Sequence, residues 1–397
     1  MINGIVPSLI LKDPQPEASE PPFRVYRIAG VLISMLLLVG LMASDVSAVF
    51  PFPRPSAIEP NIKFWVDIFA TYGERDFIVH DRDQVWRTYQ VLHLPGDGTP
   101  SRIDVDTVND YLKTKFSDIL NRLASGQAPS DYEERRVAEL FRGEPLSAYA
   151  LGAQNLRVQE GMRERFREGL LRSRYYRSSM ERIFNDAGLP PELVALAEVE
   201  SGFDSRAHSS AGAVGIWQFT RGTGQQFMRI TRYHDDRFDP ETETAAAAKL
   251  LRSNYLTFGS WPLAITAYDY GSAGMAEAAG EYASDYARIV RNYAGPHFGF
   301  ASKNYYAEFL AALQINQFED AYFPDIRYDQ APPPPPVRTD FAPRRIVRRR
   351  VLHRVVYHRR HRHHHRRRLV ASSERSAHKH HRPSRLMALS SESKAIE

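Results

Sequence analysis

The chain has 397 residues, 43% of them hydrophobic, and a formal net charge of +5 at pH 7. This length suits two domains or one domain with long appendages, and the hydrophobic fraction is that of an ordinary globular protein. The sequence contains no cysteine, which excludes disulfide bonds, thiolate metal sites, a cysteine nucleophile and a lipid anchor on cysteine.

The first predicted element is an uncharged apolar run at residues 28–43, which follows Arg24 and Arg27. Val46-Ser47-Ala48, after the run, has the small-x-small form of a signal-peptidase site. The run is shorter than the ~20 apolar residues that a membrane span needs. Residues 1–48 are therefore predicted to be a signal peptide, with an uncleaved signal anchor as the alternative. Both interpretations export the protein to the periplasm, and the second also attaches it to the membrane.

Residues 49–175 are predicted to form a mostly helical N-terminal region. Its first helix is expected at residues 62–72, where apolar residues recur with helical spacing. A short extended run is expected at residues 85–89. Further helical patterns occupy residues 104–124, 131–141, 154–173 and 175–187.

Residues 176–325 are predicted to form a second domain, in which glycine-rich loops separate helices. No stretch of the sequence alternates regularly between apolar and polar residues, so a large sheet is not expected. Five consecutive prolines at residues 332–336 predict an extended linker over residues 326–340. Residues 341–397 form an Arg/His-rich tail that is expected to be disordered, since its composition does not suit a core.

The tail is strongly basic, because residues 341–382 contain fifteen Arg or Lys, one Glu and nine of the fourteen His. Three interpretations of the tail are open. It could be a solvated extension without a specific partner, a tether to anionic envelope polymers or lipid head groups, or a weakly selective metal ligand. Export makes nucleic acid an unexpected physiological partner, although the charge would suit it. The histidines that would bind a metal are His361, His363, His364 and His365.

The most informative position is Glu200, in a predicted helix that starts after the prolines at residues 190–191. It shares one helical face with three apolar residues, Leu193, Leu196 and Ala197. A carboxyl group on an apolar face is costly to ionise, so its pKa is expected to be raised, which suits a general acid. Glu198 stands roughly 200° away around the helix and should face the other way. The alternative is that Glu200 only pairs with a neighbouring arginine.

Three later segments supply further candidate residues. A glycine-rich loop at residues 209–215 leads into Trp217 and Gln218, whose amide suits a sugar hydroxyl or amide group. An apolar helix carries Tyr268 near its end, and another helix begins around residues 304–305. Each piece alone also has a structural explanation, since Trp217 and Tyr268 are typical core residues and the glycines are typical of a turn.

The order and spacing of these motifs resemble the lysozyme-like domain of lytic transglycosylases. The motifs are Glu-Ser-x-Phe, Gly-x-x-Gly-x-x-Gln, Ala-Tyr-x-x-Gly and Asn-Tyr, at residues 200–203, 212–218, 267–271 and 304–305. The resemblance covers about residues 176–318. It is closest to the membrane-bound lytic murein transglycosylase D group, through residues 188–193 and 215–219.

The resemblance implies an all-α, lysozyme-like fold of the goose-type or SLT kind. It also implies cleavage of the bond between N-acetylmuramic acid and N-acetylglucosamine in peptidoglycan. Such enzymes leave 1,6-anhydromuramic ends and need no cofactor or metal, and the position of their single general acid and base matches Glu200. The implied supporting or substrate-binding residues are Ser201, Gly215, Gln218, Tyr268 and Tyr305.

Two positions depart from the family's pattern. Asp269 stands where asparagine is usual after the tyrosine, and Ala301 replaces the glutamate of a Glu-Thr-Arg-x-Tyr motif. These changes keep open a second interpretation, in which the protein binds peptidoglycan or acts as a scaffold with weak or no turnover. A hydrolytic goose-type lysozyme is a third interpretation, and it would produce reducing sugar ends instead of anhydro rings.

Overall fold

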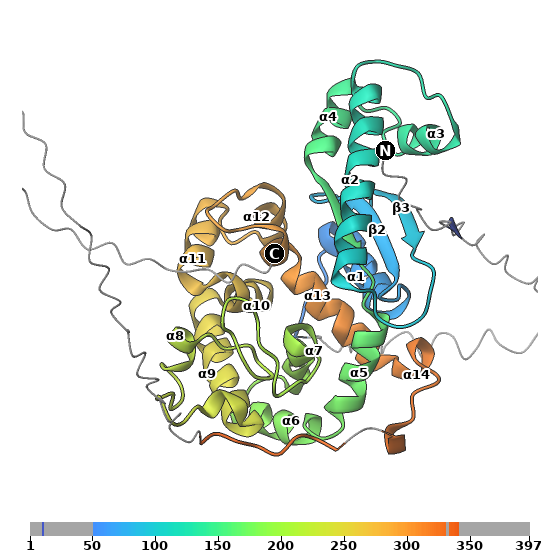
Figure 1. Cartoon of the computed structure of the whole chain (residues 1–397). Coiled ribbons are helices and arrows are strands. Elements are labelled where there is room, and N and C mark those ends of the chain that lie inside the picture. The colour runs from blue at the N-terminus through green and yellow to red at the C-terminus, as the bar shows by residue number, and fades with distance from the viewer. Residues whose placement is uncertain (1–9, 12–50, 331–332, 341–397) are drawn as a thin grey trace, which may run out of the picture. The chain divides into compact units, whose positions relative to one another are not determined.

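The computed structural model describes residues 10–11, 51–330 and 333–340. Nearly all of the predicted signal segment and the whole basic tail lie outside these residues. Helices make up most of the described chain, which confirms the mostly helical fold (Figure 1). None of the helices within the described ranges is long and apolar enough to cross a membrane.

The N-terminal region combines helices with a small antiparallel sheet. The strand order is β1-β3-β2-β4, so β2 pairs with both β3 and β4. The strands are β1 (Ile10–Leu11), β2 (Asp76–Asp81), β3 (Thr88–His93) and β4 (Leu156–Glu160). The helices are η1 (Ser56–Ile58), α1 (Glu59–Ala70), α2 (Arg102–Ala124), α3 (Tyr132–Glu139), α4 (Leu146–Gln154) and α5 (Arg163–Ser173).

Most of this sheet is not predicted by the sequence. The helical prediction is wrong for residues 156–160, which form β4 and pair with β2. Every residue of β2 is buried, so this strand lacks the alternation that marks a half-buried strand. The predicted extended run at residues 85–89 overlaps only the start of β3. Short strands that pair with distant segments leave little local signal.

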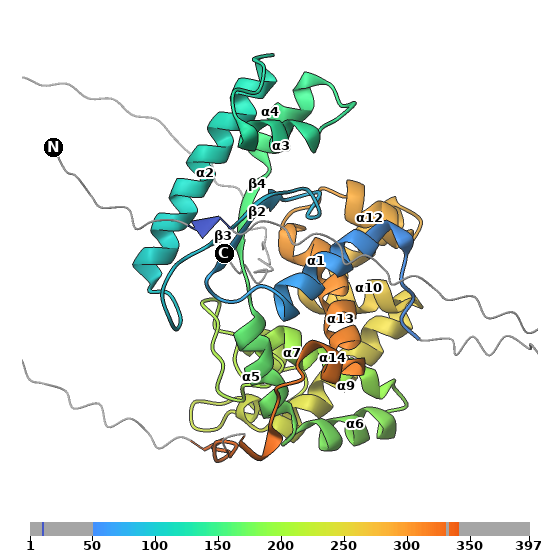
Figure 2. The ribbon, with the colours of Figure 1, turned by 90° about the vertical axis from the view of Figure 1, so that its right-hand side faces the viewer.

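The second part of the described chain is built from helices. Pro190 precedes η2 and α7, as the helix-start signal predicts. Figure 2 shows α13 crossing this part of the molecule, and it contacts α1, α7 and α10. The elements are α6 (Arg177–Asp186), η2 (Pro191–Val194), α7 (Ala195–Ser201), α8 (Arg221–Gly224), η3 (Asp236–Phe238), α9 (Pro240–Phe258), α10 (Trp261–Tyr270), α11 (Ser272–Glu281), α12 (Tyr286–Asn292), α13 (Phe300–Gln317), α14 (Glu319–Tyr322) and η4 (Tyr328–Gln330).

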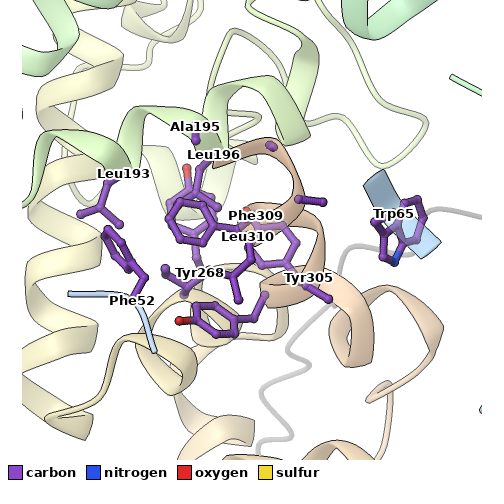
Figure 3. Close-up of a cluster of buried hydrophobic side chains, with 14 of the residues drawn as sticks. Phe52, Trp65, Leu193, Ala195, Leu196, Tyr268, Tyr305, Phe309 and Leu310 are labelled. Atoms are coloured by element: carbon purple, nitrogen blue, oxygen red, sulfur yellow. The ribbon is translucent and has the colours of Figure 1, made fainter. Parts of the chain in front are cut away.

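Two hydrophobic cores hold the described chain together. The smaller core packs one face of the sheet against α2. The larger core joins α1 to the helices of the second part, and Figure 3 shows a part of it around Leu193, Leu196 and Phe309. The predicted apolar stripe of Leu193, Leu196 and Ala197 is confirmed, since all three are 0% exposed. Burial of a leucine side chain contributes about 1.5–3 kcal/mol, so this stripe anchors α7.

Candidate active site

Glu200 lies in the last turn of α7, where the helix ends at Gly202 in a left-handed conformation with φ of 56°. Its side chain is half-buried, next to the apolar stripe that anchors the helix. The hydroxyl of Tyr305, on α13, donates a hydrogen bond to Glu200 Oε1 at 2.5 Å. The carboxyl group is therefore fixed between two helices that are far apart in the sequence.

Two buried tyrosines, Tyr305 and Tyr268, lie near this carboxyl group. Burial raises the pKa of Tyr305 and of Tyr268 well above the usual value, and the negative charge of Glu200 raises both further. Both hydroxyls therefore keep their protons at neutral pH and can donate hydrogen bonds. Tyr268 donates to the carbonyl oxygen of Trp217 at 2.8 Å, so it also links the site to the glycine-rich loop.

Ser201 connects the end of α7 to the same loop. Its hydroxyl donates to the carbonyl oxygen of Ile216 at 2.9 Å and accepts from the backbone N–H of Asp204 at 3.2 Å. These two bonds fix the chain on both sides of the Glu200 turn. Ser201 thus contacts backbone groups that shape the site.

Glu243, on α9, anchors the chain at the end of the glycine-rich loop. Its carboxylate accepts the backbone N–H of Ile216 at 2.8 Å, and the indole N–H of Trp217 donates to the neighbouring Thr244 at 2.9 Å. Burial raises the pKa of Glu243 well above the usual value, while hydrogen bonds from the loop backbone at Trp217, Ile216 and Phe219 act in the opposite direction. No local pattern in the sequence indicates this anchoring role, because Glu243 and Ile216 are 27 residues apart.

Gln218 uses its side chain within the loop itself. It is 7% exposed and adopts a positive φ of 50°. Its Nε2 donates to the carbonyl oxygen of Gly215 at 2.8 Å. It also donates to the carbonyl oxygen of Ala207 at 3.4 Å. Gly212 and Gly215 have a positive φ too, of 79° and 86°, so residues 212–218 combine three unusual backbone positions with the side-chain bonds of Gln218.

Asp269, the departure from the family's asparagine, lies beside α13. It accepts a hydrogen bond from the Ser302 hydroxyl at 2.7 Å, and its negative charge contributes to the raised pKa of Tyr305. Ser302 and Tyr305 are one turn apart on α13, so this helix contacts Asp269 and Glu200 through successive turns. The substitution therefore adds a carboxylate next to the tyrosine that holds Glu200.

Glu308 is a further carboxyl group near the site, and sequence analysis missed it. Burial raises its pKa to about 8, and the charges of Asp269 and Glu200 act in the same direction, while Arg157 opposes them. The signal in the sequence was its spacing of three residues from Tyr305, which places both on one helical face. Three carboxyl groups from α7, α10 and α13 thus influence one another.

Glu198 faces away from Glu200, as its place around the helix predicts, but it is only 6% exposed. Neither of its carboxyl oxygens has a hydrogen-bond partner among the described residues. Its carboxyl group occupies the space above Gly169 on α5, where a Cβ atom would collide with it. Burial raises the pKa of Glu198 to about 8, although Arg177 and Arg172 partly oppose the shift.

Glu198 should make the stability of the protein depend on pH. Its folded-state pKa of about 8 lies above the ordinary value of 4.5, so the folded state retains a proton that the unfolded state has lost. The free energy of unfolding should therefore fall by up to about 1.4 kcal/mol per pH unit between these two values. Glu198→Gln should remove this contribution, which urea unfolding of both proteins from pH 5 to pH 8 would measure. Equal slopes in the two proteins would contradict the assignment.

Among residues 51–330 and 333–340, no group of three or more histidine, aspartate or glutamate side chains is arranged to hold a metal ion. The histidines of the predicted tail lie outside the described residues.

Comparison with known proteins identifies the helical part. Residues 181–289 match the family described as Transglycosylase SLT domain. Over 92 residues the chain is 40% identical to membrane-bound lytic murein transglycosylase D of Escherichia coli strain K12, which covers 23% of this chain and 20% of that protein. It is 33% identical over 92 residues to a putative tributyltin chloride resistance protein of Alteromonas sp. strain M-1, which covers 23% and 44%.

Two solved structures are also similar. An inactive mutant of the lytic transglycosylase Slt from Pseudomonas aeruginosa has a TM-score of 0.30 and 17% identity, over 47% of this chain and 28% of that one. The 70 kDa soluble lytic transglycosylase of Escherichia coli has a TM-score of 0.31 and 16% identity, over 52% and 31%.

The matched range covers most of the candidate residues. It includes Glu200, Ser201, Gly215, Gln218 and Tyr268, whereas Tyr305 and Glu308 follow it in sequence. The chain spans about a fifth of the length of the murein transglycosylases that it matches. Residues 181–289 of this chain match a transglycosylase SLT domain, and over 92 residues the chain is similar to a lytic murein transglycosylase.

Proposed function

We propose that this protein is a lytic transglycosylase that cleaves the bond between N-acetylmuramic acid and N-acetylglucosamine in peptidoglycan. The observation that carries the proposal is the half-buried carboxyl group of Glu200, which the Tyr305 hydroxyl holds at 2.5 Å and which lies within the residues that match the SLT family. Partial burial favours the protonated form of such a carboxyl group, and the Tyr305 bond favours its ionised form. The group therefore suits a reaction in which it first gives and then takes a proton.

The proposed reaction uses Glu200 twice. The protonated carboxyl group first gives its proton to the glycosidic oxygen, so that the bond to the anomeric carbon breaks. The resulting carboxylate then takes the proton of the muramyl 6-hydroxyl, whose oxygen attacks the anomeric carbon and closes a 1,6-anhydro ring. One carboxyl group suffices because the substrate supplies the nucleophile, whereas ordinary glycosidases need a second carboxylate.

The surrounding residues have supporting roles in this proposal. Tyr305 orients the carboxyl group, and Tyr268 and Ser201 hold the glycine-rich loop against it. Gln218 and Gly215 shape the loop that borders the sugar. Asp269 accepts a hydrogen bond from Ser302 at 2.7 Å, and the proposed reaction does not use its carboxylate.

A binding or scaffolding protein is the second candidate. It is favoured by Ala301, which lacks the acid of the family's last motif, and by the extra negative charge of Asp269. Neighbouring carboxylates raise one another's pKa, and this would slow a step in which Glu200 must release its proton. The two candidates predict the same binding to peptidoglycan but different products.

Mass spectrometry of the soluble products from purified peptidoglycan sacculi would decide between them. The proposal predicts muropeptides with 1,6-anhydromuramic ends. Products with reducing ends would indicate that water, rather than the 6-hydroxyl, captures the sugar. A folded protein that binds sacculi and releases nothing would favour the scaffold.

The substrate implies a place in the cell envelope, and we propose export to the periplasm through the segment at residues 1–48. The signal-peptidase site and the Arg/His-rich tail lie outside the described residues, so cleavage, membrane attachment and anionic partners of the tail stay predictions. Binding of the full chain to sacculi across a salt series would test the tether, because electrostatic attraction weakens as salt increases.

A further inference from the structure

Asn304, on α13, is held by two side chains of α1. Its Oδ1 accepts hydrogen bonds from Asn61 Nδ2 at 3.0 Å and from Trp65 Nε1 at 3.2 Å. Its own Nδ2 donates to the carbonyl oxygen of Phe300 at 2.9 Å. Asn304 is 1% exposed, and both partners on α1 are buried. Buried polar groups are costly to leave without a partner, so α1 fixes this turn of α13.

Tyr305 follows Asn304 directly and contacts a different helix. Successive residues of an α-helix are ~100° apart, so Asn304 reaches α1 while Tyr305 donates to Glu200 on α7. The helix α13 contacts both α1 and α7, as the crossing in Figure 2 illustrates. A rotation or slide of α13 would displace the Tyr305 hydroxyl from Glu200, and hydrogen bonds weaken steeply when their geometry is lost.

The first turn of α13 depends on the N-terminal region (residues 51–175) for further support. Gly299 precedes the helix and supplies no side-chain cap. The guanidinium carbon of Arg157, on β4, lies 4.0 Å from the centre of the Phe300 ring. Lys303 pairs with Asp83, after β2, at 3.5 Å. Both α1 and the sheet therefore contact the part of α13 that carries Tyr305.

We propose that Asn61 and Trp65 are positioning residues for the reaction at Glu200, acting through Asn304 and Tyr305. The inference rests on the proposed function. It means that the N-terminal region helps to hold the active site in place. Neither residue touches the reacting atoms. Their effect is to keep α13 in the register at which the Tyr305 hydroxyl meets the carboxylate.

The pKa of Glu200 reports this positioning directly and needs no substrate. A hydrogen bond from Tyr305 stabilises the ionised carboxylate and therefore lowers the pKa of Glu200. Loss of that bond in Tyr305→Phe should raise the pKa by about one unit. The double substitution Asn61→Leu with Trp65→Phe removes both donors to Asn304, and it should raise the pKa in the same direction.

The test is a pH titration of the full-length protein with ¹³C-labelled glutamate carboxyl groups, in which the Glu200 signal is identified by its loss in Glu200→Gln. The decisive variant combines all three changes. If Asn61 and Trp65 act only through Tyr305, adding their substitutions to Tyr305→Phe should shift the pKa no further. Arg142→Met is the control, because it removes an exposed ion pair with Glu139 on and after α3, not on α13, and should leave the pKa unchanged.

The proposal is overturned if the Asn61/Trp65 variant folds, as near-UV circular dichroism would show, and titrates like the wild type. It is also overturned if the shifts add in the triple variant. Trp65→Phe alone, which keeps an aromatic ring in the core, replaces the double substitution if that one does not fold. Product analysis of the wild type tests the proposed function separately. Absence of anhydromuropeptides would contradict the proposed reaction, whereas the titration would still test whether Asn61 and Trp65 position Tyr305.

Discussion

Replacing Glu200 by glutamine is expected to lower the rate of muropeptide release by a factor of about 10³ or more. General acid and base catalysis contribute about 10²–10⁴-fold, and the proposed reaction takes both from this one carboxyl group. Glutamine has the same size and can still accept the hydrogen bond from Tyr305 through its amide oxygen. The melting temperature should therefore stay close to that of the wild type. Chromatography of soluble products over time would measure the rate.

Glu198→Gln is the matched control for this prediction. It makes the same chemical change two residues earlier on α7, at a buried carboxyl group that faces α5 instead of Tyr305. It should change the pH dependence of stability and leave turnover nearly intact at pH 6. A Glu200→Gln protein that keeps more than a tenth of the activity would rule out Glu200 as the acid.

The sequence predicted the part of the site that is encoded locally. The stripe of Leu193, Leu196 and Ala197 repeats with the period of one helix, so both the helix and its buried face could be derived from neighbouring residues. The glycines at positions 212 and 215 indicated the loop, because glycine is typical of turns. The family resemblance then supplied Tyr268 and Tyr305 as candidates, although no local pattern shows what either hydroxyl contacts.

The parts that were missed depend on contacts between distant residues. Glu198 is buried because Gly169, on another helix, leaves room for its carboxyl group, and nothing near Glu198 in the sequence indicates this. The anchoring of Ile216 by Glu243 and of Asn304 by Asn61 are of the same kind. Periodicity predicts which face of an element is buried, but it does not predict which polar group will meet which partner.

Substituting Gly215 by alanine is expected to disrupt the site, whereas the same change at Gly212 should be tolerated. Both glycines have a positive φ, of 86° and 79° respectively, and an alanine in that conformation costs roughly 1 kcal/mol. A Cβ atom at Gly215 would also collide with the carbonyl oxygen of Arg237 and the carboxylate of Glu243. At Gly212 it would meet no atom within 4 Å.

The difference between the two variants isolates close packing from backbone strain. Relief of the collision at Gly215 must move either Arg237 or the Glu243 carboxylate that holds Ile216, and the cost of such overpacking is about 1–3 kcal/mol. Ser201 bonds to the same Ile216, so a displacement of Ile216 reaches the turn that carries Glu200. Misplacement of a catalytic group by about 1 Å can lower the reaction rate by a factor of about 10². Urea unfolding and product release, measured on both variants, should show losses in both quantities for Gly215→Ala and only a small loss of stability for Gly212→Ala. Equal behaviour would mean that the loop follows the added methyl group without disturbing Glu200, and that Glu243 does not anchor it.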